Sequence, residues 1–199
     1  MDSVHAISSG SLDTATATGI PNGKLGMWLF LASEVMFFTG LIGAYIVLRM
    51  GHPSWPGSEG HLCVPIGTFN TLVLICSSTT IVMALAASQR AALWPLRGWL
   101  LATILLGSVF LVIKGFEYSA KLTHHILPST NIFWSCYYTL TGFHALHVLG
   151  GIVFNSLMLA CTTHTARWAL RRHRLELAGL YWHFVDIVWI FLFPLLYLF

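Results

Sequence analysis

Five long apolar stretches constrain this chain more than any other feature of its sequence. They cover about residues 25–48, 65–87, 98–118, 132–161 and 177–199, and short segments containing Pro, Gly or Arg connect them. A helix needs about 20 apolar residues to cross the hydrocarbon core of a bilayer, which is about 30 Å thick. We therefore predict an all-α fold: an integral membrane bundle of five transmembrane helices.

The composition agrees with a membrane protein and disfavours other classes. Hydrophobic residues make up 56% of the chain and charged residues 9%, against about 25% charged residues in soluble domains. The net charge of +3 is small and scattered, so we expect no nucleic-acid partner. The four cysteines form no CxxC pair, and we expect small buried thiols rather than a disulfide framework or a metal site.

The N-terminal segment differs from the rest of the chain. Residues 1–23 are polar and rich in Ser, Thr, Ala and Gly. They lack the basic region and apolar stretch of a cleavable signal peptide. We predict a flexible polar tail over residues 1–23 and one transmembrane domain over residues 24–199.

The distribution of Lys and Arg predicts the orientation of the bundle. The cytoplasmic side of a membrane protein carries an excess of these residues. Seven of the ten fall on the side of the N-terminal tail and the second and fourth loops, which predicts a cytoplasmic N-terminus and a C-terminus on the outer side. The seven are Lys24, Arg90, Arg97, Arg167, Arg171, Arg172 and Arg174.

Ionisable residues inside the predicted helices are candidates for function. They are Glu34, His144, His147, His183 and Asp186. Glu34 and Asp186 each lie about 14 Å along helices that start from the same side. Such groups are costly in hydrocarbon and are functional candidates by default. From their register we expect one polar layer in the inner half of the bundle.

Structural interpretations of the same residues remain open. His183 and Asp186 are one turn apart and could form a local hydrogen-bonded pair. Glu34 has no basic residue within a turn, so it is either protonated or bonded to a distant helix. If the Asp186 carboxylate bonds to neighbouring helices, Asp186→Leu should loosen the bundle.

Two further charged groups lie near predicted helix ends. Lys114 and Glu117 are three residues apart, and we expect an interfacial ion pair of little energetic weight. A basic cluster at the predicted inner surface is explained by topology or by binding of anionic lipid headgroups. Its members are Arg167, Arg171, Arg172 and Arg174, followed by Glu176.

Catalytic sequence motifs are not evident. The chain has no GxGxxG, P-loop, HExxH or GxSxG pattern, so we assign no catalytic residue and no metal ligand. Two membrane functions stay open as alternatives. One is a small proton channel that uses Glu34 and Asp186. The other is a haem-b electron carrier in which His144 or His147 pairs with His183.

Three stretches resemble a known family. Residues 26–38 (GMWLFLASEVMFF), 141–151 (TGFHALHVLGG) and 181–193 (YWHFVDIVWIFLF) resemble helices of subunit III of haem-copper oxidases, as in cytochrome c oxidase. Glu117 and Tyr118 resemble a Glu-Tyr pair of the same family. By this resemblance Glu34 matches the intramembrane glutamate of the family, and the histidines and Asp186 match its motif positions.

The resemblance implies a non-catalytic subunit III of an aa3- or caa3-type cytochrome c oxidase. Such a subunit binds no haem or copper itself. It packs on subunit I, which with subunit II carries haem a and copper, and a small subunit IV is a further expected partner. It holds phospholipid in a cleft, stabilises the catalytic subunit during turnover and supports proton uptake, here in a bacterial plasma membrane.

The resemblance leaves two close alternatives and one departure. The chain could instead serve a quinol oxidase or be the subunit-III-like partner of a nitric oxide reductase. The longer form of the family has seven helices, and the first two form one wall of the lipid cleft. The five predicted helices of this chain imply that another subunit supplies that wall.

Overall fold

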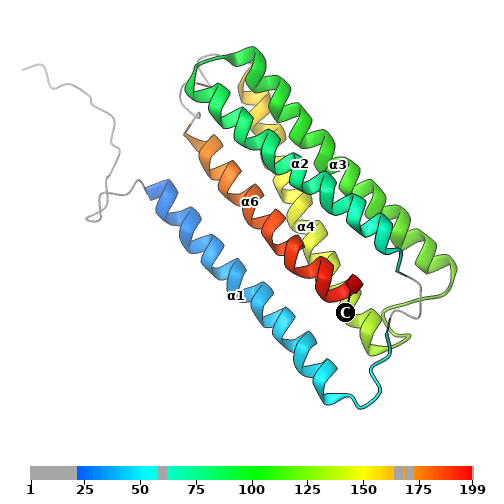
Figure 1. Ribbon diagram of the computed structural model, residues 1–199. Helices are drawn as coiled ribbons and strands as arrows, with labels where there is room; N and C mark the ends of the chain where they lie inside the picture. Colours follow the sequence, from blue (N-terminus) through cyan, green and yellow to red (C-terminus); the bar gives the residue numbers. More distant parts are fainter. Residues whose placement is uncertain (1–21, 58–61, 164–167, 169–172, 199) are drawn as a thin grey trace, which may run out of the picture.

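The computed structural model describes residues 22–57, 62–163, 168 and 173–198. Over these residues the chain has five helices that are long and apolar enough to cross a membrane. The helices are α1 (Asn22–Gly51), α2 (Val64–Gln89), α3 (Leu93–Thr123), α4 (Ile132–Cys161) and α6 (Arg174–Phe193), and the π-helical turn η1 (Pro194–Leu198) continues α6 (Figure 1). The predicted all-α fold with five membrane-spanning helices is confirmed.

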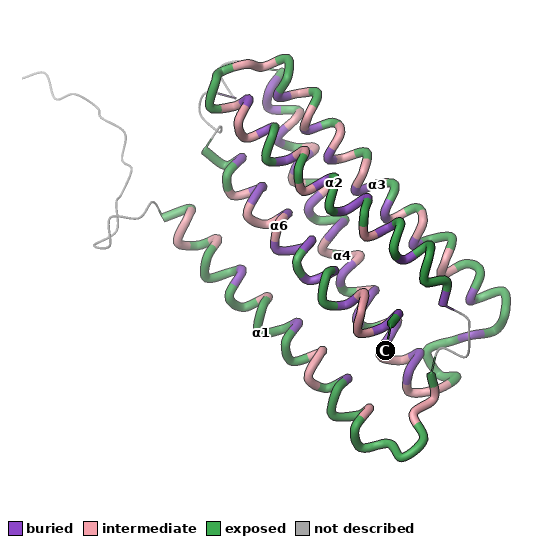
Figure 2. The backbone as a smooth tube through the Cα atoms, viewed as in Figure 1, coloured by how far each residue is buried: buried purple, intermediate pink, exposed green. Residues whose placement is uncertain are grey.

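The helices form a bundle with α6 at its centre. Helix α6 contacts α1, α2 and α4, while α2 and α3 pair along their length and α3 also contacts α4. Among the five, α6 is the most deeply buried and α1 the least, and α1 lies at one edge of the bundle (Figures 1 and 2). The start of α1 and the start of α6 lie at the same end of the molecule.

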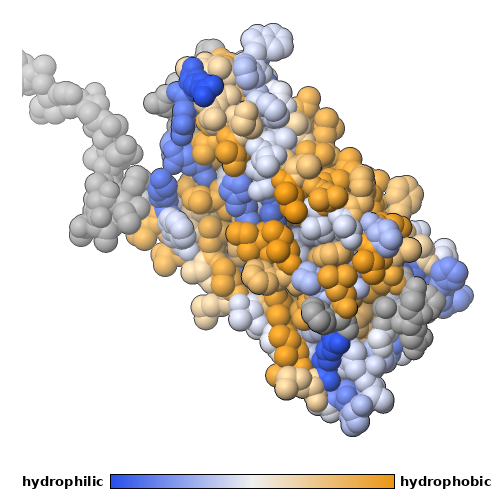
Figure 3. Space-filling view, viewed as in Figure 1, coloured by the Kyte–Doolittle hydropathy of each residue, from blue (hydrophilic) through white to orange (hydrophobic). Residues whose placement is uncertain are grey.

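The surface fits a hydrocarbon environment. Apolar residues cover most of the visible flank, and hydrophilic residues gather mainly towards its two ends (Figure 3). Large apolar side chains such as Met36 (76% exposed) and Leu29 (66% exposed) point away from the protein. In a bilayer such side chains contact lipid or another membrane subunit, so their exposure carries little cost.

Local sequence explains where the helices begin and turn. Pro65 stands in the first turn of α2, where its missing N–H costs nothing. The Asn131 side chain caps α4 by accepting a hydrogen bond from the Trp134 N–H at 2.9 Å. Pro194 ends the regular ladder of α6 because it has no N–H to donate, and the chain continues as η1.

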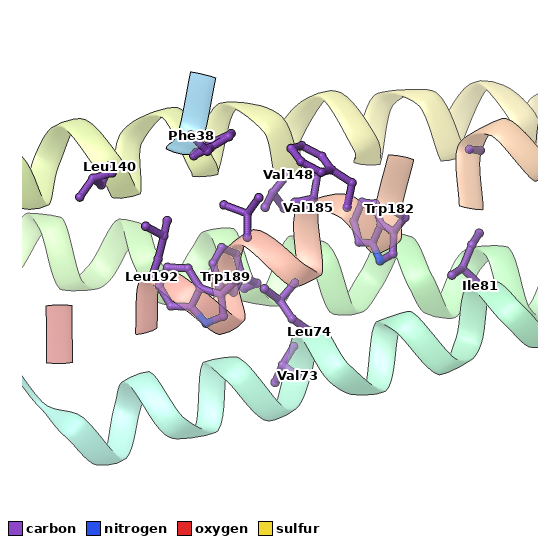
Figure 4. Close-up of a cluster of buried hydrophobic side chains, with 14 of the residues drawn as sticks. Phe38, Val73, Leu74, Ile81, Leu140, Val148, Trp182, Val185, Trp189 and Leu192 are labelled. Atoms are coloured by element: carbon purple, nitrogen blue, oxygen red, sulfur yellow. The ribbon is translucent and has the colours of Figure 1, made fainter. Parts of the chain in front are cut away.

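Glycines let Trp182 pack between two neighbouring helices. A Cβ atom built on Gly107 would lie 2.7 Å from Cη2 of the Trp182 indole, and one on Gly151 would lie 2.6 Å from its Cε3. Trp182 itself is fully buried in the core shown in Figure 4. Gly107 thus leaves room for the indole against the backbone of α3, and Gly151 does the same on α4, which packs directly on α6.

The boundaries differ from the sequence prediction in one important place. Helix α3 continues to Thr123, five residues beyond the predicted end at about 118. Lys121 is therefore a helical residue rather than part of a loop. Helix α3 also begins five residues early, at Leu93, whereas the other helices, with η1 counted as part of the last, begin and end within about three residues of the predicted limits.

The structure describes little of the predicted tail, does not test the predicted orientation and gives a mixed result for the cysteines. Residues 1–21 of the predicted tail lie outside the described residues, and α1 already begins at Asn22. The orientation in the membrane stays a prediction. None of the four cysteines, which all lie in the described part, is in a disulfide, but the expected burial holds for Cys161 and is wrong for the exposed Cys63 and Cys76.

Candidate functional site

Glu34 of α1 and His147 of α4 meet inside the bundle. The two side chains approach at 2.9 Å between Glu34 Oε2 and His147 Nε2, and each is less than one fifth exposed. The other ring nitrogen, Nδ1, lies 2.8 Å from the Phe143 carbonyl oxygen. Tyr181 of α6 donates a hydrogen bond to the His147 carbonyl at 3.0 Å, so three helices meet at this pair.

The hydrogen bonds define what this pair can do chemically. A carbonyl oxygen can only accept, so Nδ1 of His147 carries a proton. The contact between Nε2 and Glu34 then holds one further proton, either on the carboxyl group or on the imidazole. The pair can thus keep a proton within the apolar part of the chain and shift it between two atoms 2.9 Å apart.

His183 bonds to a residue that no sequence pattern singled out. Its Nδ1 lies 2.7 Å from Oγ of Ser78 on α2. The local pair with Asp186, expected as one possibility from their spacing of one turn, does not form in the described structure. The signal for Ser78 is weak, because a serine inside a transmembrane helix commonly bonds to its own backbone.

His144 and Asp186 are buried without a hydrogen bond of good geometry from any described residue. The His144 ring packs against Trp189, with ring centres 5.0 Å apart, and edge-on against Phe110 at 5.6 Å. Within the described part of the chain, neither ring nitrogen of His144 is bonded, and neither Asp186 oxygen has a hydrogen bond of good geometry, although the Ser78 hydroxyl lies near that carboxyl group. The expected polar layer is therefore divided into two bonded pairs and two isolated groups.

Replacing Asp186 tests this description. Asp186→Asn keeps the shape and removes an ionisable group that has no hydrogen bond of good geometry to a described residue, so we expect an unchanged or raised thermal midpoint of the detergent-solubilised protein complex. Ser77→Ala is the control. It removes the acceptor of the buried Trp182 N–H bond of 3.0 Å and should cost about 1–3 kcal/mol. A clear fall for Asp186→Asn would contradict the description.

Glu117 of α3 is the centre of a second polar group, which we call the Glu117 cluster. Four donors bond to its carboxylate at 2.6–3.0 Å. The cluster comprises Glu117 with Lys114 and Lys121 of α3, Tyr137 of α4 and Tyr197 of η1. Two of the five residues, Tyr137 and Tyr197, come from other elements, so the cluster joins α3, α4 and η1 at one end of the bundle.

The expected ion pair between Lys114 and Glu117 forms, but its burial does not fit the small energetic weight that we expected for it. The pair forms at 3.0 Å, but its side chains are only 5% and 10% exposed. Lys114 also lies 4.6 Å from the centre of the Trp189 ring, close enough for a cation–π interaction. Buried ions that are paired this closely become strongly destabilising when one partner is removed.

The predicted basic cluster falls largely outside the described structure. Arg167, Arg171 and Arg172 lie outside the described residues. Arg174 is exposed at the start of α6, and Glu176 forms an exposed ion pair with Lys24 of α1 at 3.1 Å. This pair and the bond from Arg97 to Thr162 lie at the end opposite the Glu117 cluster.

The three membrane histidines have separate environments. His144 packs on aromatic rings, His147 bonds to Glu34 and His183 bonds to Ser78. Within the described residues, no three His, Cys, Asp or Glu side chains are grouped as metal ligands. The geometry thus provides a proton-holding pair and a buried ionic cluster, and it gives no specific support to a haem ligated by two of these histidines.

Comparison with known proteins identifies relatives over nearly the whole chain. The sequence profile of the family described as Cytochrome c oxidase subunit III matches residues 4–199. Cytochrome c oxidase subunit 3 of Thermostichus vulcanus is 40% identical over 177 residues, which cover 87% of this chain and 86% of the relative. The probable cytochrome c oxidase subunit 3 of Mycobacterium leprae is 36% identical over 198 residues, covering 94% and 96%. That of Alkalihalophilus pseudofirmus, named cytochrome c oxidase subunit 3, is 31% identical and covers 94% and 90%.

Proposed function

The chain belongs to the cytochrome c oxidase subunit III family and is a multi-pass membrane subunit of an oxidoreductase complex, and we propose that its role there is non-catalytic. It supports the catalytic subunit by packing against it, by holding lipid and by assisting proton uptake. The Glu34–His147 pair, a carboxyl group and an imidazole bonded inside an apolar helix bundle, carries this proposal.

The oxidase is proposed to be of the aa3 or caa3 type and to accept electrons from cytochrome c. The names of the relatives support this choice over a quinol oxidase or a nitric oxide reductase. Subunit I is the proposed direct partner, with subunit II and a small subunit IV in the same complex. Haem a and copper belong to the partner subunits, and the location is the bacterial plasma membrane with the N-terminus in the cytoplasm.

The position of Glu34 supports a part in proton uptake. Glu34 lies near the middle of α1, a helix at the edge of the bundle. Because α1 is the least buried helix, few atoms of this chain separate the pair from a subunit that packs on α1. An intramembrane carboxylate in this setting fits a proton relay better than a packing role.

The apolar surface supports packing against a larger subunit and lipid. Helix α1 exposes large side chains over much of its length, including Trp28, Met36 and Val47. A bundle with so much unpartnered apolar surface fits tightly only in lipid or beside another membrane subunit. Binding to the folded catalytic subunit stabilises that subunit through mass action.

Glu34→Gln tests the proton role. The amide can still bond to His147, so we expect normal assembly and a normal rate in the first turnovers. Sustained turnover should slow because the amide cannot exchange a proton. The loss should stay well below about 100-fold, since a larger effect is typical of a direct general acid or base. Oxygen consumption and proton uptake by the purified oxidase measure this.

Glu176→Gln is the matched control, since it makes the same chemical change in an exposed ion pair. It should behave like the unmodified protein in both measurements. If Glu34→Gln also leaves turnover and its durability unchanged, Glu34 has a packing role and the proton part of the proposal fails. Co-purification with a subunit that shows haem a absorption tests membership in the aa3 type separately.

A further inference from the structure

A cavity of about 740 Å³ lies beside the Glu117 cluster. It is formed by the first turns of α2, the last turns of α3 and the connection that follows α3. Its lining includes Ile66, Phe69, Phe116, Glu117, Ala120 and Lys121. The volume lies within the range of roughly 300–1,000 Å³ that is typical of sites for small organic ligands.

The walls of the cavity are apolar and reach the flank of the bundle. Ile66 is 45% exposed, Phe69 57% and Phe116 73%, although all three line the cavity. These side chains therefore border an opening to the surroundings of the bundle. In a membrane those surroundings are acyl chains, so the walls match a hydrocarbon ligand rather than a soluble ion.

The Glu117 cluster has a surplus of positive charge, and two of its members, Glu117 and Lys121, line the cavity. Lys114 and Lys121 share the one carboxylate of Glu117, and among the described residues no other acidic side chain pairs with them. Lys121 has three N–H donors, and within the same residues its one hydrogen bond goes to Glu117. Its other near neighbours are the ring faces of Trp134 and Tyr137.

We propose that this cavity binds an anionic phospholipid, with an acyl chain along Ile66, Phe69 and Phe116 and the phosphate near Lys121. A negative headgroup would offset the surplus charge of the two lysines. The cavity also lies at one end of α2 and α3, two helices long enough to cross a membrane, and the headgroup regions flank the hydrocarbon that such helices cross. The inference rests on the proposed lipid-holding role and assigns it a site and a lipid charge.

Photolabelling of the purified oxidase tests the site. The probes are phosphatidylglycerol and phosphatidylcholine that carry the same diazirine-bearing acyl chains. Labelled peptides are mapped by mass spectrometry to residues 63–69 and 113–126, which contain the lining residues. We expect about fivefold more labelling by phosphatidylglycerol, the preference that one lysine near a membrane surface provides.

Variants separate the headgroup contact from the acyl contact. Lys121→Gln leaves Lys114 to pair with Glu117 and should bring the ratio of the two lipids close to one. Ala120→Trp fills the cavity without changing a charged residue and should reduce labelling by both lipids. Val112→Trp is the control, since Val112 is exposed on the same helix and does not line the cavity.

Three results would overturn the site. They are equal labelling by the two lipids in the unmodified protein, labelling that Ala120→Trp does not reduce, and cross-linking of these peptides to another protein chain. The number of turnovers before the oxidase loses activity is measured in parallel, and we call this its durability. This second measurement distinguishes failure of the lipid site from failure of the proposed function. If durability depends on this chain while the labelling results fail, the site is wrong and the supporting function stands.

Discussion

Glu117→Leu should destabilise the protein strongly, far more than the loss of an exposed charge. The substitution leaves two buried ammonium groups, on Lys114 and Lys121, without their shared carboxylate. Breaking a buried ion pair from one side costs about 3–5 kcal/mol. We expect a large fall in the thermal midpoint of the detergent-solubilised oxidase, or loss of this subunit from the purified complex.

Two further variants make this result specific. Glu176→Leu removes the carboxylate of an exposed ion pair and should change stability by about 0–1 kcal/mol. Glu117→Leu combined with Lys114→Met and Lys121→Met removes all three charges and should recover most of the loss, because no buried ion then lacks a partner. A triple variant as unstable as Glu117→Leu would show that shape rather than charge explains the effect.

Gly151→Ala and Gly107→Ala should each lower stability by about 1–3 kcal/mol. In both variants the new methyl group would lie within 2.7 Å of the Trp182 indole, far inside van der Waals contact. The indole cannot move freely, since it is fully buried and its N–H bonds to Ser77. Thermal unfolding of the solubilised complex measures the loss.

The same helices provide matched controls for these two variants. At Gly142 of α4 and Gly115 of α3, an added Cβ atom would meet no neighbouring atom within 4 Å. Alanine at either site should leave stability unchanged or raise it by up to about 1 kcal/mol, because alanine favours helix more than glycine does. A similar loss at all four glycines would mean that close packing on Trp182 is not the cause.

The length of the apolar stretches was sufficient to predict the fold. Each helix was identifiable because the bilayer sets a minimum length, and no tertiary information was needed. The end of α3 was misplaced because Lys121 and the polar residues around it resemble a loop in composition. The spacing of Lys114, Glu117 and Lys121 at three and four residues places them on one helix face, and this signal could have extended the helix.

The sequence did not allow us to predict which side chains pair between helices. The candidates Glu34, His144 and His147 were identified by their chemistry, but their partners depend on how each helix is rotated. Apolar residues surround most of these helices, so hydrophobic contrast does not fix the rotation. His144 and His147 are three residues apart, yet one contacts Trp189 and the other contacts Glu34.

The cavity beside the Glu117 cluster and the contacts of η1 could not be predicted from the sequence either. The Glu117 cluster needs Tyr197, which lies 80 residues away along the chain. No periodicity predicts that Pro194 changes the helix to a π-helical turn or where this turn directs Tyr197. The structure therefore adds the buried cluster and the cavity beside it, whereas the sequence predicted only an isolated ion pair.

The position of Tyr197 also sets an order of events during biosynthesis. Helix α3 leaves the ribosome and enters the bilayer long before the phenol that bonds to Glu117 has been translated. A nascent chain that stops before Pro194 would keep its three charged side chains of α3 without this donor. The Glu117 cluster is therefore complete only after η1 has been made and has packed beside α3 and α4.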